Sequence, residues 1–107
     1  MTKPDLQIEG FSIYIVRCKD NSYHTGMCRD MDKKFKEINN RMDSYFTNRP
    51  HLVPVTLIYH EEHVPFREAY AKHRYLKYAA RRYREKLIRT GKWPVGKNFK
   101  NYIAKYG

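Results

Sequence analysis

The stretch FSIYIVRCKDNSYHTG, residues 11–26, decides the fold that the sequence predicts. An apolar run is followed by a polar turn and then by a second short segment. Runs of β-branched and aromatic residues on both sides of a polar turn are typical of a β-hairpin. A three-residue loop at Asp20–Ser22 predicts that Tyr14 and His24 share one face of the hairpin, whereas a two-residue loop separates them.

The rest of the chain adds helices and one further strand to this hairpin. Asp30 is a suitable N-cap for a helix over residues 31–39. Residues 54–59 form a mainly apolar run, so we expect a third strand there, in the centre of the sheet. From Pro65 an apolar stripe at helical spacing predicts a helix that either runs to Thr90 or breaks near residues 79–80. The predicted fold is α/β, with a small three-stranded, mostly antiparallel sheet flanked by helices.

The length of 107 residues suits one small domain with a single modest core. We expect a flexible N-terminal segment at 1–10, a folded domain at 11–90 and a basic, aromatic tail at 91–107. Within the tail, docking on the core is favoured for Trp93 and Phe99. No apolar run approaches the ~20 residues that span a bilayer, and the first residues lack the apolar core of a signal peptide. We therefore expect a cytoplasmic protein without a membrane partner, with association with the nucleoid as an alternative.

The net charge of +11 is confined to the second part of the chain. Residues 1–65 hold nine basic and nine acidic residues, whereas residues 66–107 hold thirteen basic and two acidic ones. A local excess of this size favours a polyanionic partner, nucleic acid and DNA in particular, over a merely solvated face. Four cations recur at helical spacing within the basic region: Arg74, Lys77, Arg81 and Arg84.

Two further features carry weaker signals. Residues 41–53 form a predicted loop in which basic and aromatic residues alternate. In this loop Tyr45 and Phe46 either contact nucleic acid or cover the edge of the core. Cys18 and Cys28 are offset along the hairpin, so we expect two free thiols rather than a disulfide.

Several segments resemble the signature of the GIY-YIG nuclease family. Residues 12–14 (Ser-Ile-Tyr) and 24–26 (His-Thr-Gly) resemble its two halves, and residues 29–35 resemble its first helix. Residues 54–62 resemble the family's third strand, and residues 68–69 (Glu-Ala) lie where its next helix begins. The order and spacing match over most of the chain, and the resemblance implies the same small α/β fold.

The resemblance also implies hydrolysis of a phosphodiester with one divalent metal, Mg²⁺ or Mn²⁺. In the family, hairpin tyrosines position the water, an arginine on the first helix stabilises the phosphate, and a glutamate on the later helix binds the metal. Tyr14 retains the first tyrosine, but the second falls on His24, the arginine on Lys34 and the glutamate on His73. Because Mg²⁺ prefers oxygen ligands, we expect cleavage to be weak or absent. A shift of the helix by about a turn would make Glu68 the metal ligand and restore activity.

Three functions are compatible with this pattern. The favoured one is a nucleic-acid-binding protein on a degenerate GIY-YIG scaffold, and its predicted contacts are Lys33, Lys34, Arg74, Lys77, Arg81 and Arg84. The first alternative is an active endonuclease with altered ligands, in which Tyr14, His24 and Lys34 are catalytic and His73 binds a softer metal. The second is a protein-binding or inhibitory module whose basic face meets an acidic protein.

Overall fold

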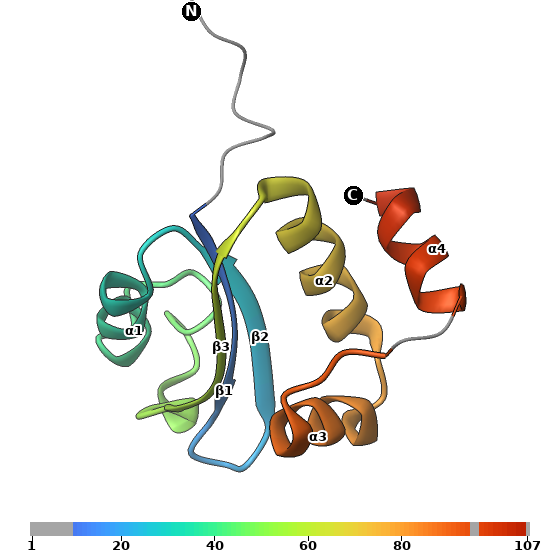
Figure 1. Ribbon diagram of the computed structural model, residues 1–107. Coiled ribbons are helices and arrows are strands. Elements are labelled where there is room, and N and C mark those ends of the chain that lie inside the picture. The colour runs from blue at the N-terminus through green and yellow to red at the C-terminus, as the bar shows by residue number, and fades with distance from the viewer. Residues whose placement is uncertain (1–9, 95–96, 107) are drawn as a thin grey trace, which may run out of the picture.

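The computed structural model describes residues 10–94 and 97–106, and it shows a sheet with helices on both faces (Figure 1). The strands are β1 (Phe11–Arg17), β2 (Tyr23–Cys28) and β3 (Thr56–Val64). The helices are α1 (Met31–Asn39), the short 3-10 helix η2 (Pro50–Leu52), α2 (Phe66–Tyr78), α3 (Arg81–Thr90) and α4 (Lys97–Tyr106). Both strand pairs are antiparallel, in the order β2-β1-β3, so the predicted fold is confirmed.

Two further predictions concern the N-terminal segment and the crossing of a membrane. The expectation of a flexible segment at 1–10 lies, apart from Gly10, outside the described residues. Within the described ranges, no helix combines the length and the apolar character needed to cross a membrane.

The strand β1 is central because both of its faces are buried. Its side chains alternate between two core clusters, as the geometry of a strand requires. Tyr14 and Val16 belong to the cluster under α1 and the loop that follows it. Ile13 and Ile15 belong to the cluster under α2 and α3 (Figure 1). Burial on both faces explains why β1 is a continuous apolar run in the sequence.

The prediction that the third strand is central was wrong, and its predicted end was too early. β3 lies at an edge of the sheet and continues beyond residue 59 to Val64. Its second half is polar because an edge strand needs apolar side chains only where it meets the core. There His60 lies 3.1 Å from the Ser12 hydroxyl, and Glu61 forms an ion pair with Lys72. A polar strand end of this kind has no hydrophobic periodicity to reveal it.

The hairpin places Tyr14 and His24 on one face, which was one of the two alternatives that the sequence left open. Tyr14 pairs with Gly26, and Val16 pairs with His24. The predicted three-residue loop was too short, because the loop extends over Cys18–Ser22 between the last paired residues. The predicted loop has three residues and the observed loop has five. Because both numbers are odd, Tyr14 and His24 lie on the same face of the hairpin in either case. Both hairpin cysteines are free thiols, as expected.

The predicted long helix breaks into α2 and α3, which was one of the two alternatives. Ala79 and Ala80 at the junction both have extended backbone, with ψ of 152°. The Arg84 guanidinium donates from Nη1 to the carbonyl oxygens of Leu76 (2.6 Å) and Ala79 (3.0 Å). These bonds satisfy carbonyls at the C-terminus of α2 that no longer have helical partners. The four cations expected on one helical face are therefore divided between two helices (Figure 1).

The C-terminal segment packs on α2, which confirms the docking of Trp93 and Phe99. Their rings stack with centroids 5.7 Å apart, and Phe99 meets the Tyr75 ring edge-on at 5.0 Å. The Trp93 indole donates to the Tyr59 hydroxyl (3.0 Å) and to Glu61 (3.2 Å). Residues 97–106 form the helix α4, where only a tail was predicted.

Candidate nucleic-acid interface

A pocket of about 480 Å³ opens along the outer edge of β2, and we call it the β2-edge pocket. One wall comes from α1 and the loop after it, and the other from α2 and α3. Six residues that the sequence singled out line it: Tyr14, His24, Lys34, His73, Lys77 and Arg84. Residues from five separate elements thus meet at one edge of the sheet.

Tyr14 forms part of the pocket and is held by close approach to Gly26. A Cβ at residue 26 would overlap with the ring and hydroxyl of Tyr14, so this position requires glycine for space. Burial, followed by the nearby charge of Asp43, raises the pKa of Tyr14 well above its ordinary value. Tyr14 is therefore a neutral hydroxyl near pH 7, able to donate a hydrogen bond but poorly suited to act as a base.

His24 lies beneath Tyr45, which was one of the residues with two open interpretations. The two rings stack with centroids 4.3 Å apart, and the Phe46 ring meets His24 edge-on at 5.0 Å. Phe46 is 0% exposed and covers the core, whereas Tyr45 is 40% exposed at the pocket. Burial lowers the pKa of His24 to about 4, so the imidazole is neutral at pH 7.

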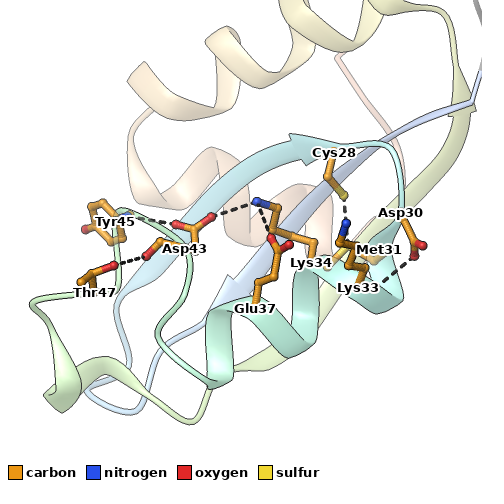
Figure 2. A network of polar contacts seen from close by, with 9 residues as sticks. All are labelled: Cys28, Asp30, Met31, Lys33, Lys34, Glu37, Asp43, Tyr45 and Thr47. Carbon is orange, nitrogen blue, oxygen red and sulfur yellow. Dashed lines mark hydrogen bonds and ion pairs between the residues drawn. The ribbon is translucent and has the colours of Figure 1, made fainter.

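Lys34 is held between two carboxylates (Figure 2). Its Nζ lies 3.0 Å from Asp43 and 3.3 Å from Glu37. Burial alone would lower the pKa of Lys34, but hydrogen bonds to Asp43 and Glu37 outweigh it and leave the pKa raised. Asp43 also accepts a hydrogen bond from the backbone of Tyr45 at 3.0 Å. Lys34 is therefore positively charged, and its nearest anion is the carboxylate of Asp43, which also lines the pocket.

Asp43 belongs to the site but was not predicted from the sequence. It lines the pocket and positions both Lys34 and Tyr45. An aspartate placed two residues before a loop aromatic can accept from that aromatic's backbone amide, which is the local signal that was available. Nothing local indicated the ion pair with Lys34, since it joins a helix to a loop.

His73 lines the pocket from α2. Burial, with a smaller contribution from Lys77, lowers its pKa, and the nearby backbone of Thr25 opposes this shift. The alternative metal ligand, Glu68, does not line this pocket. Its carboxylate pairs instead with Lys72 at 2.8 Å.

The donors of the pocket do not fit a hard divalent metal. Asp43 supplies a carboxylate, but Lys34 engages it, and His24 and His73 supply imidazole nitrogens. Within residues 10–94 and 97–106, no group of three or more His, Cys, Asp or Glu side chains is arranged to hold a metal ion. Mg²⁺ requires oxygen ligands in near-octahedral geometry. The arrangement suits the binding of an anion better than metal-assisted hydrolysis.

The remaining predicted contacts lie outside the pocket. The Arg81 guanidinium lies 4.0 Å from the ring centre of Tyr23, which does line the pocket, and forms an ion pair with Glu85 at 3.0 Å. Arg74 lies over the ring of a neighbouring tyrosine of α2. Lys33 is exposed on α1, and its backbone amide donates to the N-cap aspartate. The predicted contacts therefore form a pocket group and an outer group.

Comparison with known proteins gives the family but no function. No protein-family model matches the chain, and no solved structure matches it significantly. The chain is 35% identical to a UPF0213 protein of Staphylococcus saprophyticus over 79 residues, which are 74% of this chain and 94% of that protein. It is 34% identical to a UPF0213 protein of Clostridium perfringens over 71% of this chain and 80% of the relative. It is also 35% identical to the UPF0213 protein YazA of Bacillus subtilis, over 70% of this chain and 74% of the relative. The chain therefore belongs to the UPF0213 family.

Proposed function

We propose that this protein binds nucleic acid, DNA above all, in the β2-edge pocket, on a degenerate GIY-YIG scaffold whose cleavage activity is weak or lost. The observation that carries the proposal is that four residues from four separate elements meet in one pocket. Tyr14, His24, Lys34 and His73 come from β1, β2, α1 and α2, and the resemblance to the nuclease family implies that these positions act together. All four line one pocket.

The charges around this pocket favour a phosphate backbone as the ligand. Lys34 stands on one wall, and Lys77 and Arg84 stand on the other. Arg81 adds a further cation beside Tyr23, which also lines the pocket. Cations on both sides of an open groove provide the sequence-independent part of nucleic-acid affinity, since each phosphate contact releases counterions. The side chains of Tyr14, His24 and His73 line the same pocket and can donate hydrogen bonds to phosphate oxygens.

Weak or lost cleavage is supported by the chemistry of three altered positions. His73 stands where the resemblance implies the carboxylate that would bind the metal, and burial lowers the pKa of its imidazole. Lys34 keeps a positive charge but lacks the bidentate geometry of arginine. The scaffold thus retains groups that hold a phosphate and lacks those that would activate it.

Replacement of Lys77 by glutamine is expected to weaken binding of a labelled short duplex in EDTA. Lys77 lines the pocket, so its loss removes about one phosphate contact and reduces the slope of log affinity against log salt by about 1. Fluorescence anisotropy between about 50 and 200 mM salt measures this slope. Lys36→Gln is the matched control, because Lys36 is an exposed lysine of α1 that does not line this pocket. Equal slopes for the two variants would exclude the pocket as the binding site.

Replacement of Asp43 by asparagine is expected to tighten binding of the same duplex by about fivefold, equivalent to about 1 kcal/mol. The substitution removes a negative charge from the pocket and one of the two carboxylates that pair with Lys34, which leaves Lys34 more available to a phosphate. Glu37→Gln serves as the control, because Glu37 also pairs with Lys34 but does not line the pocket. Weaker binding by Asp43→Asn would show that Asp43 is needed to position Lys34, and it would contradict this prediction.

A further inference from the structure

A second pocket, of about 370 Å³, lies between α2, α3 and the segment that follows α3. It shares no lining residue with the β2-edge pocket. Leu76 and Leu87, both buried in the core, lie at its apolar base. Three aromatic side chains also line it, and we call it the aromatic pocket: Tyr75, Tyr83 and Trp93. Its size is within the range of small-ligand sites, roughly 300–1,000 Å³.

The aromatic side chains are held in place before any ligand arrives. The Trp93 indole is fixed by its hydrogen bonds to Tyr59 and Glu61. Tyr75 lies 6.2 Å from Trp93 between ring centroids, with a 57° angle between the rings. Tyr83 is 45% exposed and leaves part of its ring open to a ligand. A planar ligand can therefore stack on the exposed ring of Tyr83, beside the packed rings of Trp93 and Tyr75.

The charged side chains of the aromatic pocket are all cationic among the described residues that line it. Lys86 and Lys92 line it, and none of its described lining residues carries a carboxylate. Arg82 donates to the Tyr83 hydroxyl at 3.4 Å. This hydrogen bond, with the charges of Arg82 and Lys86, lowers the pKa of Tyr83. A pocket with aromatic walls and cations complements a ligand that combines a flat aromatic ring with an anion.

We propose that the aromatic pocket binds one nucleotide, with its base stacked on the exposed ring of Tyr83, beside Trp93, and its phosphate at Lys86 and Lys92. Two sources supply this chemistry: a free mononucleotide, and an unpaired nucleotide of a bound strand. Only the second source rests on the proposed function, since it requires the strand to continue from the β2-edge pocket along α2 and α3.

The test uses the fluorescence of Trp93, which is the only tryptophan in the chain and lines the pocket. Adenosine monophosphate should quench it saturably and bind more tightly than adenosine or ribose 5-phosphate, because each of these lacks one half of the ligand. Tyr83→Ala should weaken binding of adenosine monophosphate by about tenfold, as expected for the loss of one stacking contact. Tyr70→Ala is the matched control, because Tyr70 is an exposed tyrosine of α2 that does not line the pocket. Circular dichroism verifies that both variants are folded.

A short oligoadenylate strand separates the two sources. Tighter binding of the strand than of the free nucleotide, reduced by Lys77→Gln only for the strand, assigns the pocket to an unpaired nucleotide. Equal or tighter binding of the free nucleotide, unchanged by Lys77→Gln, assigns it to a mononucleotide. The proposal is overturned if neither ligand quenches Trp93 saturably, or if Tyr83→Ala binds both as the unchanged protein does. A failure of duplex binding alone would remove the proposed function and leave the mononucleotide result standing.

Discussion

Truncation of Phe46 to alanine is expected to lower the free energy of unfolding by about 3–5 kcal/mol. Phe46 is 0% exposed and is among the largest fully buried side chains of the described residues. It belongs to the core cluster under α1, and its ring supports both His24 and Tyr45 edge-on at 5.0 Å. Its removal leaves a cavity that the surrounding β-sheet cannot fill by relaxation.

Urea denaturation of the unchanged protein and the variant measures this difference. Small domains have total stabilities of about 5–15 kcal/mol, so the variant is expected to be marginally folded. Tyr45→Ala is the matched control, since this neighbouring aromatic is 40% exposed and its removal opens little core volume. A loss below about 1 kcal/mol for Phe46→Ala would show that the loop does not seal the core.

Mild acid is expected to destabilise the protein through His24. Burial lowers its pKa to about 4 in the folded state, while the unfolded chain has the ordinary value of about 6.5. As the pH falls from 6.5 towards 4, the unfolded state takes up a proton that the folded state does not. Stability is thus complete above about pH 6.5 and is lost progressively below it. Between about pH 7.5 and 5.0 the loss attributable to His24 is about 2 kcal/mol.

Urea denaturation at these two pH values, for the unchanged protein and for His24→Gln, tests this prediction. The variant should lose less stability in acid, because glutamine does not titrate. His51→Gln is the control, since His51 is an exposed histidine in η2, away from the β2-edge pocket. Burial also lowers the pKa of His73, so His73 adds a further loss of stability in acid. The unchanged protein and both variants share this loss, because all three retain His73. An equal acid response in His24→Gln and the unchanged protein would contradict the assignment to His24.

The parts of the fold that local chemistry determines could be predicted from the sequence. The N-cap role of Asp30 is visible in the chain and is realised by a 3.1 Å hydrogen bond from the amide of Lys33. The apolar run that forms β1 made this strand predictable. The central position in the sheet, however, was wrongly predicted for the third strand. Sheet order depends on which helices cover which face, and a run of apolar residues does not encode it.

Two of the missed features depend on contacts between distant segments. The bonds from Arg84 to the end of α2 help define the break between α2 and α3, yet in sequence Arg84 is one cation among several. Asp43 enters the site through an ion pair from a loop to a helix. The helix α4 was missed for a different reason, because Phe99, Tyr102, Ile103 and Tyr106 are spaced at i, i+3, i+4 and i+7, a helical pattern that the prediction of a tail overlooked. The contacts of Arg84 and Asp43, in contrast, join segments that no local pattern relates, which is why they could not be predicted.

One gel tests the central claim, that a nuclease-like pocket holds DNA without cutting it. Supercoiled plasmid is incubated with purified protein in EDTA, Mg²⁺ or Mn²⁺, and half of each sample is deproteinised before loading. The account predicts retarded plasmid in EDTA and intact supercoiled plasmid after deproteinisation in all three conditions. Nicked or linear plasmid that depends on the metal and disappears with Tyr14→Phe would contradict the loss of cleavage, and unretarded plasmid throughout would contradict the binding of DNA.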